Sequence, residues 1–384
     1  MSFEGTIELN NAKRDADLSS GKIFQHSPLV EVFSYMVSGK NLSDLDGKLK
    51  NKESRFLTAN DINNAVIYIK EQARQAGGGN AYAAVELNEL RTFAIYPLLQ
   101  EELKLLNWMG NYTAVGFNDT IYAKVKKLNG EKSRFQALNG DVVFPAWEYG
   151  KYPVATTAVS GGYIIDYRKI QFGNLDDENA GMEQVRVDIR NKAARYVIFT
   201  IWNSISTTNN VKFVAQGSGI TKTALDEIVR AIRRFGSVGI FGDYSMVSQI
   251  NGFQGYEGTN PVIGGISEAA MNEMRKTGLI GMYNGATVME ITNEFDLTKP
   301  LPTADGFETY FPEGLMFIIP NGKQSPVQTW TRGGLTSFTG NDVATGHVMT
   351  RFDLEVACDV AKTEEYKVGM IFDNTFGDIT DPRM

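Results

Sequence analysis

The residues that could support chemistry are few in this chain, and the most suggestive group is a glycine-rich turn. The segment Gly217-Ser-Gly-Ile-Thr-Lys-Thr223 follows a predicted strand and precedes a predicted helix, which is the context of a phosphate-binding loop. Such a loop requires glycine immediately before the lysine, so that the backbone can curl around the phosphate. Thr221 occupies that position. We therefore interpret the turn as a threonine helix cap, with nucleotide binding through Lys222 as the enzymatic alternative.

Histidine and cysteine offer little further scope for catalysis. The chain has two histidines, His26 and His347, and neither lies at metal-ligand spacing from other donors. A Ser/His/Asp triad would need one of them. The single cysteine, Cys358, excludes an intramolecular disulfide, and its place on the apolar side of a predicted strand indicates a small buried residue. We predict no catalytic, cofactor-binding or metal-binding residues.

Carboxylates and aromatic residues do not form a recognisable site either. Asp353, Glu355 and Asp359 alternate with apolar residues, as on the solvated or subunit-facing side of a strand. Trp147 and Tyr149 could anchor an interface or stack on a sugar.

The composition indicates a globular chain with a substantial core. Its 384 residues suggest two or three domains, and 42% of them are hydrophobic. The net charge of −7 argues against nucleic acid as the principal ligand of the whole surface. No apolar run approaches the ~18 residues that span a bilayer, and residues 1–12 lack the apolar stretch of a signal peptide. We expect a soluble protein of a cytosol, with no membrane partner.

The longest predicted element lies within residues 171–206. A helix from Asp177 to Ile205, capped by Asp176 and Asp177, would be about 44 Å long. Its charged first half is expected to be surface, and its apolar part, 196–202, to be core under a C-terminal sheet. Gly181 argues against regular first turns, and the β-branched run 197–201 leaves a buried strand as the alternative. The apolar positions at helical spacing are Met182, Val185, Ile189, Ala193, Val197, Ile201 and Ile205.

The N-terminal part is predicted to be a polar arm followed by helices. Asn60 is the expected cap of a helix over 61–75, which ends at the glycines 77–79. A second helix from Asn80 is expected to kink or break at Pro97. The apolar set of the first helix is Ile62, Val66, Ile67 and Ile69.

From Tyr112 to Phe172 the pattern indicates a hairpin arm. Alternation around Ile121 to Val125 is followed by Asn-Gly turn signals at 129–130 and 139–140. A change of parity near Ile170 suggests a bulge. Because a two-stranded ribbon is marginal in water by itself, the arm requires a partner surface, such as another subunit.

The rest of the chain indicates a mixed α/β unit followed by strands. A helix beginning at Thr221 or Thr223 ends at Gly236, with Arg230, Arg233 and Arg234 favouring its C-terminal dipole. Near the C-terminus, 352–360 alternates with a period of two, and 366–372 is its expected partner strand. Other strands are expected at 211–215, 238–241, 286–291 and 315–319, and helices at 243–250 and 267–276.

This order of elements resembles the tailed-bacteriophage major capsid protein of the Hong Kong 97 type, a fold shared with encapsulin shells. The resemblance covers about Asn111 to Asp373. The segments that carry it are Tyr163–Ile170 leading into the long helix, Leu225–Val229, Gly239–Ser245, Gly285–Val288, Arg351–Glu355 and Gly369–Ile371.

The resemblance implies an α+β fold with an N-terminal arm, an extended β-hairpin loop, a peripheral domain and an α/β axial domain. The peripheral domain would be built on the long spine helix plus an antiparallel sheet. The implied boundaries are 1–110 for the arm and helical region, 111–172 for the extended loop, 173–210 for the spine helix, 211–325 for the axial domain, 326–373 for the peripheral strands and 374–384 for the tail.

The implied function is structural and not enzymatic, without a cofactor. Copies would form the hexamers and pentamers of an icosahedral or prolate shell around double-stranded DNA, bound without sequence specificity. Lys192 and Arg195 are candidates to face that DNA. Portal, scaffold or decoration proteins would be further partners. The protein would act in the virion capsid, and assembly would take place in the host cytoplasm. The alternatives are an encapsulin-like compartment with protein cargo, a nucleotide-binding enzyme using residues 217–223, and a carbohydrate-binding fibre or tail component.

Overall fold

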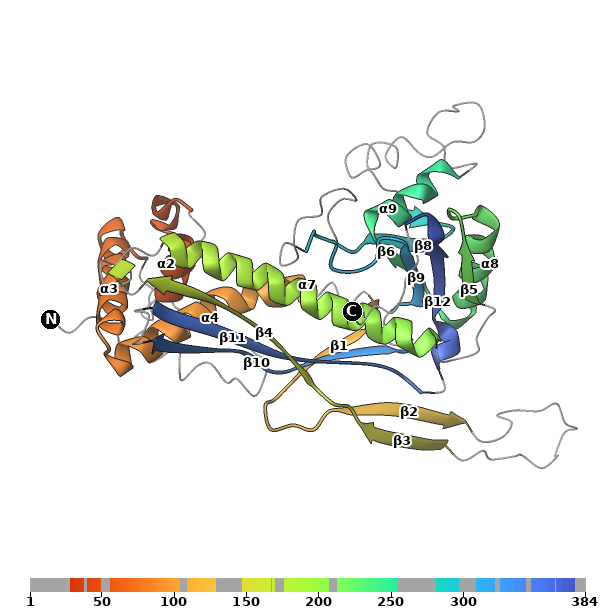
Figure 1. The fold of residues 1–384 in the computed structure, drawn as a ribbon, viewed down its shortest axis with the longest axis horizontal. Helices are drawn as coiled ribbons and strands as arrows, with labels where there is room; N and C mark the ends of the chain where they lie inside the picture. The colour runs from red at the N-terminus through yellow and green to blue at the C-terminus, as the bar shows by residue number, and fades with distance from the viewer. Residues whose placement is uncertain are drawn as a thin grey trace, which may run out of the picture.

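The fold is an elongated body with a unit at one end and a projecting ribbon (Figure 1). Helices α2 and α3 lie at one end, α7 crosses the length of the body, and a second sheet with α8 and α9 lies at the other end. This computed structural model describes residues 28–37, 40–49, 56–103, 109–128, 147–166, 168–169, 176–206, 213–253, 281–296, 309–321, 325–342, 347–362 and 364–376.

The N-terminal region is helical, as predicted, but the cap of its second helix and the burial of one residue differ from the prediction. It consists of α2 (Pro28–Val37), η1 (Leu42–Leu45), α3 (Ala59–Gly77) and α4 (Ala81–Leu103). Thr58 and not Asn60 caps α3, because its hydroxyl accepts from the Asp61 N–H while the Asp61 carboxylate accepts from the Thr58 N–H. Ile67, predicted to be apolar core, is 60% exposed.

Helix α4 continues through Pro97, so of the predicted kink or break the break is wrong. Proline removes one backbone hydrogen bond there. Leu90, Leu99 and Leu103 are buried on both sides of it. Tertiary packing of the helix therefore outweighs the local loss.

The long helix is α7 (Asp176–Ser206), 31 residues. All seven apolar positions predicted for it are buried, which confirms the helix and makes the strand alternative wrong. The helix includes Gly181, so its first turns are regular despite that residue. The side chains of Asp176 and Asp177, the predicted caps, lie outside the described residues.

A four-stranded sheet lies against α7 and α4. Its order is β1 (Asn111–Val115), β10 (Val327–Asp342), β11 (His347–Val360) and β4 (Thr157–Asp166), and β1 is parallel to β10 while the other pairs are antiparallel. The predicted alternation of 352–360 is confirmed, with the even-numbered residues buried. Its predicted pairing with 366–372 is wrong, because β11 pairs with β10 and β4.

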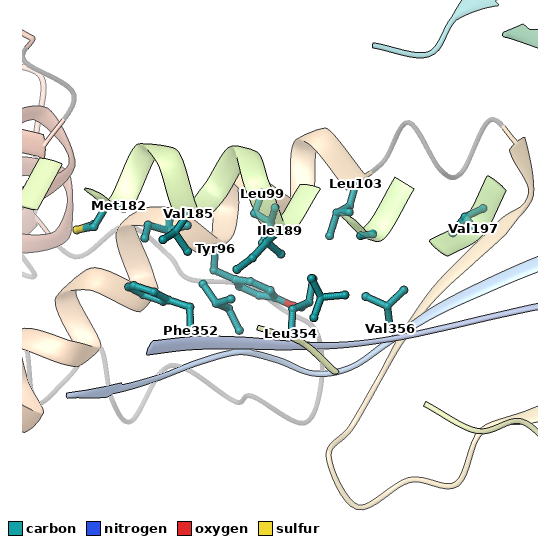
Figure 2. Close-up of a cluster of buried hydrophobic side chains, with 14 of the residues drawn as sticks. Tyr96, Leu99, Leu103, Met182, Val185, Ile189, Val197, Phe352, Leu354 and Val356 are labelled. Atoms are coloured by element: carbon teal, nitrogen blue, oxygen red, sulfur yellow. The ribbon is translucent and has the colours of Figure 1, made fainter. Parts of the chain in front are cut away.

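The main core fills the space between the helices and this sheet. Figure 2 shows Met182, Val185, Ile189 and Val197 on α7 above Phe352, Leu354 and Val356 on β11, with Tyr96, Leu99 and Leu103 of α4 among them. Trp202 near the end of α7 meets Phe372, with ring centroids 6.0 Å apart. The apolar second half of α7 is therefore covered in part by C-terminal strands, as predicted.

A six-stranded sheet forms the second unit. Its order is β5 (Val214–Gly217), β12 (Gly369–Asp373), β9 (Leu315–Pro320), β6 (Val238–Gly242), β8 (Ala286–Glu290) and β7 (Met282–Tyr283). The strands predicted at 238–241, 286–291 and 315–319 are thus confirmed. The predicted helix at 267–276 lies outside the described residues.

The two faces of this second sheet contribute to different cores. In β9, Leu315, Phe317 and Ile319 join the main core, whereas Met316 and Ile318 face a separate core. That second core is closed by α8 (Lys222–Ile232), α9 (Tyr244–Val247) and η4 (Ser248–Gly252). The sheet therefore joins the spine to the second unit through shared apolar packing.

The ribbon consists of β2 (Tyr122–Leu128) and β3 (Trp147–Pro153), which pair antiparallel. It projects away from the body beyond the four-stranded sheet (Figure 1). Both predicted Asn-Gly turns and the predicted bulge near Ile170 lie outside the described residues.

Candidate functional site

The glycine-rich turn between β5 and α8 is occupied by side chains of the same chain. The Gly219 N–H donates to Asp373 Oδ1 at 2.8 Å, and the Ile220 N–H donates to Gln249 Oε1 at 3.0 Å. Thr221 caps α8 by accepting from the Ala224 N–H at 3.4 Å, as predicted. The anionic group bound by this turn is thus the Asp373 carboxylate of the same chain.

Asp373 is strongly hydrogen-bonded at the end of β12. Gln249 Nε2 donates to its Oδ2 at 3.0 Å, and the N–H and hydroxyl of Thr375 donate to its Oδ1 at 3.0 and 2.7 Å. Burial opposes ionisation, but the bonds from Gln249, Gly219 and Thr375 outweigh it and lower the pKa of Asp373 to about 2. The carboxylate ties the glycine-rich turn, η4 and β12 together.

The histidines and the cysteine are not brought together. His347 begins β11, opposite Asp342 and Asp166 on its two neighbouring strands, and His26 lies outside the described residues. Cys358 is buried, as predicted, and burial raises the pKa of its thiol. Over the part of the chain that the structure describes, no group of three or more His, Cys, Asp and Glu residues could hold a metal ion.

The outward carboxylates of β11 are paired with neighbours. Glu355 accepts from Arg332 on β10, with a shortest separation of 2.5 Å, and Asp353 accepts from Arg351 Nε at 2.8 Å. Asp359 accepts from the Tyr152 hydroxyl. These pairs stabilise the open face of the sheet and its junction with the ribbon.

The base of the ribbon is firmly attached to the body. A small core of Ile121, Ala123, Trp330 and Ala357 joins it to β10 and β11. The Val154 N–H donates to the Ile121 carbonyl at 3.0 Å, and Lys362 Nζ lies 4.5 Å from the centroid of the Tyr152 ring. The side chains of Trp147 and Tyr149, the predicted anchors, lie outside the described residues. The ribbon is therefore a supported projection.

The charged first half of α7, expected to be surface, has exposed positions such as Glu183 and also forms ion pairs with other parts of the same chain. Arg186 pairs with Glu102 of α4. Arg190 pairs with Glu294 at 2.5 Å, and the Tyr310 hydroxyl donates to Asp188 at 2.5 Å. These contacts fix the second unit against the middle of the spine helix.

The two basic residues predicted to face DNA both have partners on α7 itself. Lys192 Nζ lies 2.9 Å from Asp188 Oδ2, and the Arg195 guanidinium lies 5.1 Å from the centroid of the Phe199 ring.

Sequence reasoning missed a buried ion pair between Arg91 of α4 and Glu178 of α7. Both side chains are 1% exposed. Arg91 Nη1 also donates to Asn88 Oδ1 at 2.8 Å and to Thr339 Oγ1 at 3.0 Å, and the Tyr163 hydroxyl donates to Glu178 at 3.3 Å. The available signal was a charged residue on the apolar side of α4, directly after Leu90.

The contacts described above connect elements of the chain to one another. Among the polar residues singled out in the sequence, Thr221, Asp353, Glu355 and Asp359 are hydrogen-bonded or ion-paired within the chain, and the ribbon is supported at its base. None of the helices in the described ranges combines the length and apolar character needed to cross a bilayer.

Comparison with protein families gives a match over most of the chain. The family model of YonB, described as an SPbeta prophage-derived putative capsid protein, matches residues 26–372. No curated protein matches the chain.

Three solved structures are similar at low sequence identity. A structure from Microbacterium phage Oxtober96 is 11% identical, covers 68% of this chain and 89% of its own, and has a TM-score of 0.47. A virus-like particle from Pyrococcus furiosus is 9% identical, covers 72% and 97%, and has a TM-score of 0.42. An encapsulin complex from Synechococcus elongatus is 10% identical, covers 71% and 86%, and has a TM-score of 0.41. At these identities and TM-scores, the family assignment rests on the family model.

Proposed function

The chain belongs to the family of the SPbeta prophage-derived putative capsid protein YonB, and from this premise we propose that it is a major capsid protein with the Hong Kong 97-type fold. Copies form hexamers and pentamers that close an icosahedral or prolate shell around double-stranded DNA. The observation that carries the proposal beyond the family is the ribbon β2–β3, which is attached to the body at its base and projects from it.

The ribbon supports assembly for a physical reason. A two-stranded ribbon gains little stability in water by itself, so its projecting part is expected to lie on a neighbouring copy. Each subunit then makes several contacts at once, and the closed symmetry of the shell reinforces each weak contact. The long helix α7 provides a stiff strut between the helical end and the second unit (Figure 1).

In this proposal the domains keep the boundaries expected from the resemblance, except that three strands pair with a sheet outside their own segment. Residues 211–325 form the axial domain, to which β12 adds a strand. The spine helix at 173–210 and the strands within 326–373 form the peripheral domain. The segment 111–172 is the extended loop, and its flanking strands β1 and β4 pair within the peripheral sheet.

The proposed role is structural, in the virion capsid, with assembly in the host cytoplasm. Portal, scaffold or decoration proteins are proposed as further partners. The nucleotide-binding alternative is disfavoured because the Gly219 N–H in the turn already donates its hydrogen bond to the Asp373 carboxylate. A phosphate in that turn would face a carboxylate of lowered pKa.

Electron microscopy of the purified, expressed chain tests this function. The wild type is expected to form closed shells or capsomers. A variant in which a two-residue Asn-Gly turn joins Lys124 directly to Lys151, a register pair of the ribbon, retains the base around Ala123 and Tyr152 and removes the remaining register pairs of β2 and β3. We expect it to fold and to lose shell formation. A dispersed wild-type monomer under all assembly conditions would contradict the proposal.

The contents of the shells separate the capsid from a compartment of the encapsulin type. Nuclease-protected double-stranded DNA inside particles from the source supports a capsid. A specific protein cargo in place of a genome would contradict that part of the proposal.

A further inference from the structure

Three arginines gather at the C-terminal end of α8. Arg230 lies in the last turn of α8, and Arg233 and Arg234 lie in the following η3 (Arg233–Phe235). All three are exposed. Within the described residues, none of them forms an ion pair with a carboxylate. We call these three residues the arginine cluster.

Arg233 is held in place by the turn between β7 and β8. Its Nη1 donates to the Asn284 carbonyl oxygen at 2.6 Å. The guanidinium also lies against Gly285, where an added Cβ would be 2.9 Å from Nη1. Its remaining N–H groups are therefore presented in a fixed orientation, which reduces the entropy lost on binding.

The nearest carboxylates on the same helix neutralise this end only in part. Asp226 Oδ1 accepts from the Tyr283 hydroxyl and from Asn284 Nδ2, both at 2.7 Å, so this oxygen is directed toward the turn between β7 and β8. Glu227 is the other acidic residue of α8. Residues 222–235 thus hold four basic side chains against two acidic ones, in a chain of net charge −7.

An aromatic pair continues the surface from η3 to η6 (Glu365–Lys367). Phe235 and Tyr366 pack edge to face, with ring centroids 5.4 Å apart, and Lys367 Nζ lies 5.9 Å from each centroid. Lys367 Nζ forms an ion pair with Glu364 Oε1 at 2.8 Å, which compensates its charge. The uncompensated positive charge is therefore concentrated on the arginine cluster, beside the exposed ring of Tyr366.

We propose that the arginine cluster contacts the phosphate backbone of the enclosed double-stranded DNA, so that this end of α8 faces the interior of the shell. The inference rests on the proposed function. Guanidinium groups bind phosphate oxygens through paired, charge-assisted hydrogen bonds. Such contacts are independent of sequence and weaken with salt, which suits a container that must hold any genome.

Duplex binding by the full chain tests the proposal. The probe is a random-sequence DNA duplex of about 30 base pairs, titrated by fluorescence anisotropy from about 50 to 200 mM salt. For Arg230→Glu/Arg234→Glu we expect at least about a tenfold loss of affinity at low salt. The slope of log affinity against log salt should fall by about 2.

The matched control reverses two exposed lysines of the N-terminal region, Lys48→Glu/Lys70→Glu, with the same change in net charge. An equal loss in both variants, or no binding by the wild type, would overturn the proposal. Preferential binding of poly-glutamate over DNA would also overturn it, in favour of an acidic protein partner. Arg230→Gln/Arg234→Gln repeats the test if the reversed variant does not fold.

Electron microscopy of the same samples separates this inference from the proposed function. If the Arg230→Glu/Arg234→Glu variant forms shells and binds DNA as tightly as the wild type, the inference is overturned and the proposed function is not. Failure of the wild type to form shells counts against the proposed function, whereas the binding comparison still decides the role of the cluster.

Discussion

Gly181 of α7 lies directly against the ring of Tyr163 on β4. A Cβ added at position 181 would be 2.7 Å from Tyr163 Cγ. The same ring packs on Phe352, with centroids 6.1 Å apart, and its hydroxyl donates to Glu178. On the strand side, a Cβ at Gly161 would be 3.0 Å from Val185 Cγ1. The two glycines let helix and strand approach closely at the start of the spine.

Gly181→Ala should therefore destabilise the protein, although alanine is the better helix former by about 1 kcal/mol. We expect the free energy of unfolding to fall by about 1–3 kcal/mol, because the added methyl group overpacks the contact. Urea unfolding measures the change. Gln184→Ala, at an exposed position of the same helix, should change it by less than about 0.5 kcal/mol. If Gly181→Ala instead stabilises the protein, the close contact with Tyr163 is not maintained in solution.

The buried pair of Arg91 and Glu178 predicts a large penalty when one partner is removed. Arg91→Leu leaves the Glu178 carboxylate buried without its counterion, and we expect a loss of about 3–5 kcal/mol in the free energy of unfolding. Arg91→Leu/Glu178→Leu should recover much of that loss. The exposed pair of Arg74 and Glu71 is the control, for which Arg74→Ala should cost less than about 1 kcal/mol. Equal costs for Arg91→Leu and Arg74→Ala would mean that the first pair is solvated.

The fold was predictable where one periodic pattern determines one element. The buried positions of α7 recur without interruption, and the helix follows from them. Strand pairing was less accessible, because the alternation of β11 identifies its buried face but not its neighbours. Strand β10 was missed because Gly333 and Gly334 shift its register between Arg332 and Leu335, and its buried positions include threonines.

The candidate site shows the same limit. The ribbon itself was predicted from the alternation around Ile121 to Val125, whereas its need for a partner surface stays a prediction from its length and composition. The side chains that close the glycine-rich turn, Asp373 and Gln249, are distant from it in sequence, so no local pattern could indicate them. Arg91 and Glu178 are similarly brought together only by the packing of α4 on α7.

The register shift in β10 predicts a position at which only glycine fits well. Gly334 has a φ of 77°, in the left-handed region, and an added Cβ would be 3.3 Å from the Tyr96 ring. Gly334→Ala should lower the free energy of unfolding by at least about 1–2 kcal/mol, the cost of that backbone conformation for other residues. Gly340→Ala on the same strand is the control, because no neighbouring heavy atom lies within 4 Å of an added Cβ there. It should leave the free energy of unfolding in urea nearly unchanged. Equal effects at both positions would argue against the register shift.

The hydrogen bonds of Asp373 predict a specific dependence of stability on pH. Its folded pKa of about 2 lies below the ordinary value of 3.8, so its ionised form stabilises the folded state. That contribution is fully present above about pH 4 and is lost as the pH falls through about 2. The difference in free energy of unfolding between the wild type and Asp373→Asn should therefore be constant above about pH 5 and shrink between about pH 4 and 2. Urea unfolding at a series of pH values measures it, with Asp44→Asn, at an exposed position, as the control for the substitution itself. A difference for Asp373→Asn that does not change with pH would show that the carboxylate is not held ionised by Gly219, Gln249 and Thr375.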